Sequence, residues 1–317
     1  MTVEQLPLFP GDEPQPVRLH AGLSPGAPLD AAMARFEQHM IQQDYAENTV
    51  KSFLGDLRIL KRYLKDNPPV TEISTKDLKD FLHWLQHERG KPCSPKSYAR
   101  RLTTLKVFFS WLADLGLLPS DPAAPLTHKP VHTPLPRILY DDQVEQVLAV
   151  TRQLMVGENT ADGNPDPRPH LLVSLLLHTG IKKQECMRLR LAHIDTSDPA
   201  GPVIHVRYDK PGMEYKERRL RLPAAWGRTL AAYRRIYEPQ DHLFPCTGRN
   251  LEYVLGNVAK LAGLPDGLSF EMLRWTCAVR DFQARMDADR LRRKLGLSQM
   301  SWQETEPRIM RLAEPPL

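Results

Sequence analysis

The sequence predicts a mainly α fold with a small β-hairpin or sheet, an α+β protein built from two domains. Its 317 residues, 41% of them hydrophobic, exceed what one small core usually holds. Apolar residues recur at three- and four-residue steps along most of the chain, which is the period of an amphipathic helix. Residues 203–223 instead alternate apolar and polar residues on both sides of a Pro-Gly turn, which predicts a hairpin inside a helical domain.

Composition divides the chain into four stretches. Residues 1–27 are dense in Pro and Gly without a sustained period, so we expect a disordered tail. Residues 28–119 contain four helical patterns and form the predicted small helical domain. Residues 120–136 are Pro-rich and polar, which predicts a linker, and residues 137–317 form the second domain.

The first predicted helix has Asp30 as its N-cap and turns Met33, Phe36, Met40 and Ile41 toward the core.

Helix signals also place the other three helices of the first domain. The second helix begins near Thr49 and carries basic residues opposite its apolar face. Ser74 caps the third helix, Gly90 ends it, and Ser94 opens the fourth. These signals predict a compact unit of four or five helices.

The second domain is predicted to hold helices on both sides of the hairpin, followed by a weakly patterned tail that contains Pro307.

Charge and cysteine spacing bound the function classes. Lys and Arg number 43 against 38 Asp and Glu, a formal net charge of +5, which favours anionic partners such as nucleic acid. The four cysteines show neither metal-ligand nor disulfide-framework spacing, so we expect no metal and no cofactor. Without a signal pattern or a long apolar run, we expect a cytoplasmic protein with no membrane partner.

Five segments in order resemble the tyrosine recombinase (phage integrase, Xer-type) family across about residues 28–305. They are YAENTVKSFLGDLRILKRYL, SPKSYARRLTTLKVFFSWLADLGLLPSDPA, LPRILYDDQVEQVL, HTGIKKQECMRLRLAHID and LSFEMLRWTCA. Five segments in the right order are more specific than any single motif. The resemblance implies a SAM-like helical core-binding domain followed by a tyrosine-recombinase catalytic-type domain.

The family cleaves DNA with a tyrosine that attacks the scissile phosphate. Two arginines bind the non-bridging oxygens, because planar guanidinium groups bind phosphate bidentately, while histidines or a lysine move protons. In this chain Lys182 stands at the first arginine, Glu185 keeps an acidic position, Glu271 stands at the histidine of the second box and Arg274 keeps its arginine. The resemblance therefore implies a damaged phosphate site.

The nucleophile is missing as well. Leu297 replaces a further histidine, the tyrosine position falls at Glu306, and no tyrosine follows Tyr253 in the sequence. Ser301 and Thr305 lie nearby, but a hydroxyl without a neighbouring base is a poor nucleophile. We therefore expect no intact catalytic residue and a protein that is not an enzyme.

The catalytic lysine of the family matches Lys210 on the hairpin, with Lys216 as the alternative. We expect Lys182, Arg274 and Glu271 to form a structural ion cluster rather than an anion site. The remnant positions are Lys182, Lys210, Lys216, Glu271, Arg274, Leu297 and Glu306.

Basic side chains on the second and fourth helices are the predicted DNA contacts, because the family lays this helix pair across the major groove. The predicted set is Lys51, Arg58, Lys61, Lys96, Arg100, Arg101, Lys106, Lys182, Lys210 and Arg274.

A short peptide near the N-terminus resembles the motif by which bacterial proteins bind the replicative sliding clamp. Gln5, Leu6, Leu8 and Phe9 carry that resemblance, and apolar anchors in an extended segment suit a groove.

These residues support three hypotheses. The first is a non-catalytic DNA-binding protein, an accessory or architectural factor that sits beside an active integrase on double-stranded DNA. The second is an active recombinase that uses a tyrosine from a partner subunit in trans. The third is a protein-interaction factor recruited through the N-terminal peptide.

Overall fold

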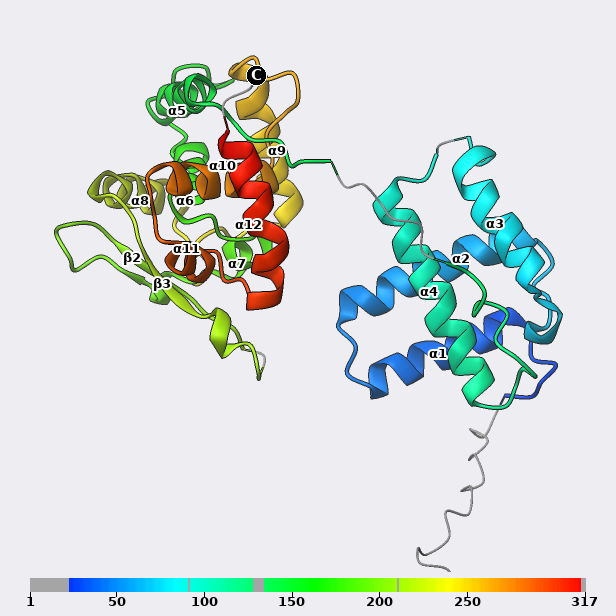
Figure 1. Cartoon of the computed structure of the whole chain (residues 1–317). Helices are drawn as coiled ribbons and strands as arrows, with labels where there is room; N and C mark the ends of the chain where they lie inside the picture. Colours follow the sequence, from blue (N-terminus) through cyan, green and yellow to red (C-terminus); the bar gives the residue numbers. More distant parts are fainter. Residues whose placement is uncertain (1–22, 91, 128–133, 210, 315–317) are drawn as a thin grey trace, which may run out of the picture. The chain divides into compact units, whose positions relative to one another are not determined.

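The computed structural model describes residues 23–90, 92–127, 134–209 and 211–314, and the chain divides into two compact units, Met1–Pro134 and Leu135–Leu317 (Figure 1). We call them unit 1 and unit 2. The predicted sliding-clamp peptide and Lys210 lie outside the described residues. No helix in these four ranges is both long and apolar enough to span a membrane.

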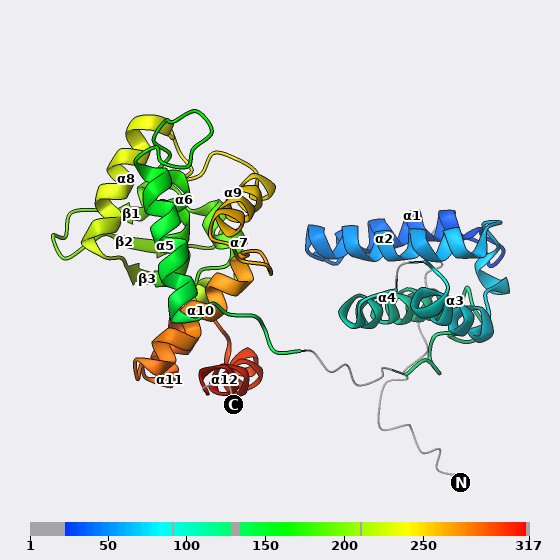
Figure 2. The same ribbon diagram turned by 90° about the horizontal axis from the view of Figure 1, so that it is seen from above.

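Unit 1 is a helical unit of two layers. Figure 2 shows α1 and α2 in one layer and α3 and α4 in the other. Its elements are α1 (Leu29–Gln42), α2 (Glu47–Leu64), the 3-10 turn η1 (Val70–Glu72), α3 (Thr75–His87) and α4 (Pro95–Asp114). The apolar faces of these helices form one core, as the helical period predicts.

The predicted caps of the third and fourth helices are confirmed. The Ser74 hydroxyl accepts a hydrogen bond from the backbone N–H of Asp77, and Ser94 does the same for Ser97. The first helix differs from the prediction: it begins at Leu29, so Asp30 lies in its first turn and is not the N-cap. Ile41 is 60% exposed while its neighbour Met40 is buried, so Ile41 lies outside the face that α1 buries.

Unit 1 extends beyond the predicted boundaries at both ends. Leu23 and Ala27, which we assigned to the tail, pack into its core. Ala123 and Leu126, which we assigned to the linker, are buried there too, and the Thr75 hydroxyl donates to the carbonyl of Pro122 at 2.8 Å. Apolar side chains between prolines therefore return the chain to the core.

Unit 2 combines helices with a small sheet. Its helices and 3-10 turns are α5 (Asp141–Met155), α6 (Arg168–Thr179), α7 (Lys183–Arg188), η2 (Leu191–His193), η3 (Glu214–Lys216), α8 (Ala224–Tyr237), α9 (Gly248–Leu261), α10 (Phe270–Gln283), α11 (Ala288–Lys294) and α12 (Gln299–Ala313). The strands are β1 (Ile194–Asp195), β2 (Val203–Val206) and β3 (Arg218–Arg221).

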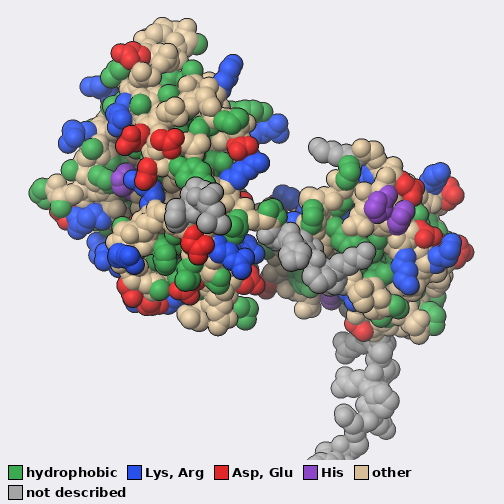
Figure 3. Space-filling model, turned by 45° about the horizontal axis from the view of Figure 1, so that its top comes forward, with side chains coloured by type: hydrophobic (Ala, Val, Ile, Leu, Met, Phe, Trp, Pro, Cys, Tyr) green, Lys and Arg blue, Asp and Glu red, His purple; other side chains and the backbone are tan. Residues whose placement is uncertain are grey.

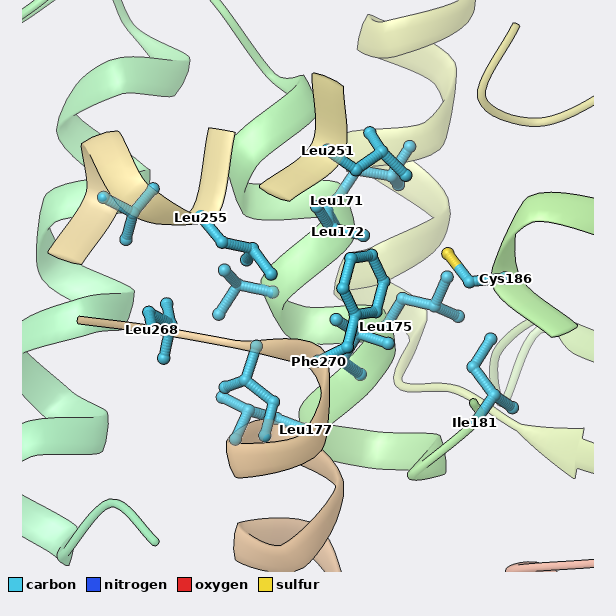
Figure 4. Packing of buried hydrophobic residues seen from close by; sticks show 14 of the residues in the cluster. Leu171, Leu172, Leu175, Leu177, Ile181, Cys186, Leu251, Leu255, Leu268 and Phe270 are labelled. Atoms are coloured by element: carbon cyan, nitrogen blue, oxygen red, sulfur yellow. The ribbon is translucent and has the colours of Figure 1, made fainter. Parts of the chain in front are cut away.

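The α6 helix lies at the centre of unit 2, in contact with α5, α8, α9 and α10. Its sequence is apolar on nearly all sides, as expected for a buried helix. Figure 4 shows Phe270, the first residue of α10, beside Leu175 of α6 within this core. Ile181 and Cys186 of the first segment that resembles a catalytic box belong to the same core cluster as Phe270 of the second.

The sheet has the strand order β1-β2-β3 and is antiparallel, and its third strand packs against α11 (Figure 1). Ile204 pairs with Leu220, which confirms the predicted hairpin. The short strand β1 extends the hairpin to a three-stranded sheet within the described residues.

The C-terminal segment is a helix and not the weakly patterned tail that we predicted. Pro307 lies inside α12, where it removes one backbone hydrogen bond. Trp302 and Ile309, placed before and after that proline, are buried in a cluster with Val279 of α10. This packing stabilises the helix despite the proline.

Candidate functional site

Five side chains at or beside the remnant positions line one pocket of unit 2. The pocket has a volume of about 620 Å³, and Lys182, Glu271, Arg274, Leu297 and Thr305 all contribute to its wall. They come from the start of α7, the first two turns of α10, the turn after α11 and the helix α12. The fold therefore brings together segments more than a hundred residues apart.

A glycine turn places Lys182 at the pocket. Gly180 ends α6 in the left-handed conformation, with φ of 60°, and Lys182 is the N-cap of α7. A Cβ at Gly180 would lie 3.0 Å from the Leu295 side chain and 3.3 Å from the Cys277 sulfur. Close packing and a positive φ together require glycine here.

Arg274 binds the carboxyl ends of two helices. Its guanidinium donates to the carbonyl of Gly180 after α6, and to the carbonyl of Leu295 after α11 at 2.7 Å. Burial lowers the pKa of Arg274 to about 10, although the charge of Glu185 opposes this shift. The side chain is thus still a cation at neutral pH, and it joins segments of the pocket wall.

Lys182 is a half-buried cation without a bound acceptor. Its ammonium group has no hydrogen bond or ion pair with any residue that the structure describes. Burial lowers the pKa of Lys182, and the charge of Arg274 lowers it further. An ammonium in this position is available to an anion in the pocket.

The buried ion pair of this site joins Glu185 and Arg218, which we did not predict. Arg218 donates to both carboxylate oxygens, at 2.9 and 2.8 Å, and the Tyr208 hydroxyl and the backbone N–H of Lys182 donate to the same group. Burial raises the pKa of Glu185, but the hydrogen bonds and charge of Arg218 and the donation from Tyr208 outweigh it and lower that pKa to about 2.

The alternation of β3 was the signal for Arg218. Leu220 and Leu222 are buried, so a residue two positions earlier faces the same side of the strand. An arginine on that inward face requires a buried acceptor, and Glu185 is the buried carboxylate nearby.

The ion cluster that we expected between Glu271 and the cations of the pocket is absent from the described residues. Glu271 is exposed on the first turn of α10 and pairs with neither Lys182 nor Arg274 there. Arg274 binds carbonyl groups instead, because the two helix ends lie within its reach.

The helix that would carry the nucleophile presents a hydroxyl that donates its proton elsewhere. The Thr305 hydroxyl donates to the carbonyl of Ser301 at 2.7 Å, as helical threonines often do. Thr305 lines the pocket, whereas Glu306 is half-buried beside it and is not part of the lining. Thr305 forms no hydrogen bond with a basic side chain within residues 135–209 and 211–314 of this unit.

Lys216 lies at the end of the hairpin, in η3. Its ammonium group is 6.0 Å from the ring centroid of Tyr208 and 5.2 Å from that of Tyr215. Lys216 therefore lies near the rings of Tyr208 and Tyr215, and Tyr208 is the residue that donates to Glu185.

Two of the predicted DNA contacts in unit 1 are bound to a buried carboxylate. Arg100 donates to both oxygens of Asp56 at 2.9 and 2.7 Å, and Arg101, itself buried, donates to one of them at 3.2 Å. The Thr104 hydroxyl donates to Asp56 as well. These bonds join α2 to α4, so the two arginines have a structural function that our prediction missed.

The other basic residues of α2 and α4 differ in whether their side chains form ion pairs or hydrogen bonds. Lys51 pairs with Glu47, Lys61 pairs with Asp30, and Lys106 donates to the carbonyl of Ala124 at 3.4 Å.

Arg58 and Lys96 are exposed and form no ion pair with the described residues. Figure 3 shows basic and acidic side chains interspersed over the visible face of each unit. The face in view therefore carries individual basic side chains and not one wide basic field.

Comparison with known proteins supports the reading of both units. Residues 33–116 match the model described as "Phage integrase, N-terminal SAM-like domain". Tyrosine recombinase XerC of Lacticaseibacillus casei (strain BL23) is 25% identical over 280 residues, which cover 85% of this chain and 91% of that protein.

Solved structures share the fold at low identity. A lambda integrase dimer bound to a COC' core site has a TM-score of 0.70 and 16% identity, covering 92% of this chain and 80% of its own. The XerH site-specific recombinase bound to difH substrate in a pre-cleavage complex has a TM-score of 0.63 and 16% identity. The match covers 90% of this chain and 94% of the XerH chain. These likenesses confirm the predicted fold class.

Proposed function

We propose that this chain is a member of the tyrosine recombinase family that binds duplex DNA without cutting it. In this role it is an accessory or architectural subunit of a recombination or integration complex in the cytoplasm. The lambda integrase and XerH structures are described as bound to a core site and to difH substrate, which supports DNA as the partner.

The observation that carries this proposal is the composition of the pocket at the remnant positions. Arg274 is in place, but the other positions hold Lys182, Glu271 and Leu297, and the adjacent helix presents Thr305. The fold of the site is retained while the groups that perform the chemistry differ.

Each replacement removes a distinct catalytic contribution. Lys182 is a point charge and lacks the bidentate fork that binds two phosphate oxygens. Leu297 and Glu271 remove imidazoles, and a positioned general acid contributes about a hundredfold or more to a rate. The absence of a tyrosine at Glu306 or Thr305 removes the covalent intermediate itself.

A covalent-trapping experiment tests the loss of cleavage. The purified chain is incubated with a nicked suicide duplex and resolved on a denaturing gel. We expect no protein–DNA adduct. An adduct formed by the chain alone would refute the proposal. If an active integrase supplies the tyrosine in trans, the phosphotyrosyl bond forms on the integrase, and an integrase–DNA adduct that increases only when this chain is also present would support that alternative.

A second experiment tests DNA binding on the exposed basic positions of α2 and α4. Arg58→Ala combined with Lys96→Ala removes two charges that pair with no described residue. We expect weaker duplex binding and a salt slope that falls by about one for each lost phosphate contact.

Lys76→Ala combined with Lys79→Ala is the control, because both residues are exposed on α3 and Lys76 pairs only with Asp80 of the same helix, at 3.3 Å. Equal weakening by the two double variants would place the DNA surface elsewhere. If the parent protein shows no salt-dependent duplex binding at all, the function through protein contacts alone is favoured instead.

A further inference from the structure

The pocket at the remnant site has walls that a phosphodiester site does not require. Apolar side chains form most of its lining: Leu268, Phe270, Trp275, Ala278, Leu295 and Leu297. Its volume of about 620 Å³ falls within the range of small-molecule sites, about 300–1,000 Å³. A phosphate group alone would leave much of this apolar surface in contact with water.

The charged residues of the pocket favour an anion. Glu185 is neutralised by Arg218, and Glu252 in the pocket lining pairs with Lys183 at 2.6 Å. The remaining charges are Lys182, Arg274 and the exposed Glu271, so cations outnumber carboxylates.

Lys182 is the cation with free donors. Arg274 uses two of its nitrogens on backbone carbonyls, whereas the Lys182 ammonium group binds no acceptor among residues 134–209 and 211–314. A half-buried ammonium without a partner loses hydration and gains no compensating hydrogen bond. A ligand that brings an anionic group next to Lys182 supplies that bond.

We propose that this pocket binds a small organic anion, with its carboxylate or phosphate on Lys182 and an apolar body, such as an aryl ring, against Phe270, Trp275 and Leu297. The inference is independent of DNA binding by unit 1. It requires only that one molecule contact both the Lys182 ammonium group and the apolar side chains of the pocket.

Calorimetric titration of the full chain with three probes tests the two halves of the inference. Naphthoate carries both the ring and the negative charge, naphthamide carries the ring without the charge, and inorganic phosphate carries the charge without the ring. We expect naphthoate to bind one site per chain, about tenfold more tightly than naphthamide, as a charge-assisted hydrogen bond predicts. Phosphate should bind more weakly than naphthoate.

Two kinds of variant separate charge from shape. Lys182→Gln should lower naphthoate affinity about tenfold and leave naphthamide unchanged. Lys260→Gln, which removes an exposed lysine of α9 that does not line the pocket, is the matched control and should change neither probe. Leu297→Trp or Thr305→Phe should reduce binding of both aryl probes by filling the pocket, with the thermal transition confirming that each variant is folded.

Four outcomes would overturn the inference. The first three are no naphthoate binding at millimolar concentration, equal affinities for naphthoate and naphthamide, and equal effects of the Lys182 and Lys260 variants. Phosphate binding as tight as naphthoate binding would reduce the pocket to a simple anion site and would also refute the proposal.

Discussion

The Arg218 guanidinium lies within hydrogen-bond distance of both oxygens of the Glu185 carboxylate, with Nη1–Oε1 at 2.9 Å and Nη2–Oε2 at 2.8 Å. The two side chains are only 7% and 3% exposed, so water screens the pair little. The Nε atom of Arg218 donates to the carbonyl of Lys294 at 2.7 Å. One arginine therefore joins β3 to α7 and to the end of α11.

Removal of Arg218 should destabilise unit 2 strongly. Arg218→Met leaves the Glu185 carboxylate buried without its cation, and breaking a buried pair on one side costs about 3–5 kcal/mol. Urea unfolding followed by tryptophan fluorescence measures this free energy. The double variant Glu185→Leu with Arg218→Met should recover part of the loss, because no buried charge remains. A single variant as stable as the parent would contradict the assigned pair.

The same pair predicts how stability depends on pH. The pKa of Glu185 in the folded chain is about 2, below its ordinary value of 4.5. A lowered folded pKa contributes stability above the unfolded pKa, and that contribution is lost as pH falls through the folded value. Glu185 should therefore contribute about 3 kcal/mol at neutral pH, and this amount should disappear between about pH 4.5 and pH 2.

Glu185→Gln isolates this contribution. Parent and variant are compared by urea unfolding at a series of pH values. The difference in their unfolding free energies should shrink across that acidic window and stay constant above it. A difference that is independent of pH would show that the carboxylate does not titrate as stated.

Arg101 should matter for the stability of unit 1 rather than for DNA contact. Arg101→Met removes one of the cations on the buried Asp56, which is 3% exposed, and we expect a loss of about 1–3 kcal/mol. Arg58→Met on the exposed face of α2 is the control and should change stability by less than about 0.5 kcal/mol. Thermal unfolding by circular dichroism compares the two, and equal transitions would argue against the role of Asp56.

The elements of the fold were largely predictable, because their signals are local. Ser74 and Ser94 precede apolar runs of helical period, and both cap helices as expected. The C-terminal helix was missed because Pro307 is a local signal against a helix, while the packing of Trp302 and Ile309 that outweighs it depends on distant residues.

The site was predictable as a set of positions but not as a set of contacts. The family pattern identified Lys182 and Arg274, which do line one pocket. It could not show that Arg274 binds two carbonyls, since backbone acceptors leave no trace in the sequence. The role of Asp56 was partly visible, because it follows Phe53 by three residues within the apolar stripe of α2, where a carboxylate requires a partner.

Restoring the family residues should restore a covalent adduct if the pocket keeps its ancestral geometry. The variant combines Lys182→Arg, Glu271→His, Leu297→His and Thr305→Tyr, and it is incubated with the nicked duplex. Groups that act as a unit are strongly non-additive, so Thr305→Tyr alone should give no adduct.

The two candidate positions for the new tyrosine should give different rates of adduct formation. Spacing from the family pattern places the nucleophile at Glu306, whereas the pocket is lined by Thr305. A misplacement of about 1 Å can cost a hundredfold in rate. The combined variant with Thr305→Tyr should therefore form adduct about a hundredfold faster than the one with Glu306→Tyr. The reverse order would mean that α12 must rotate before a residue at this site can reach the phosphate.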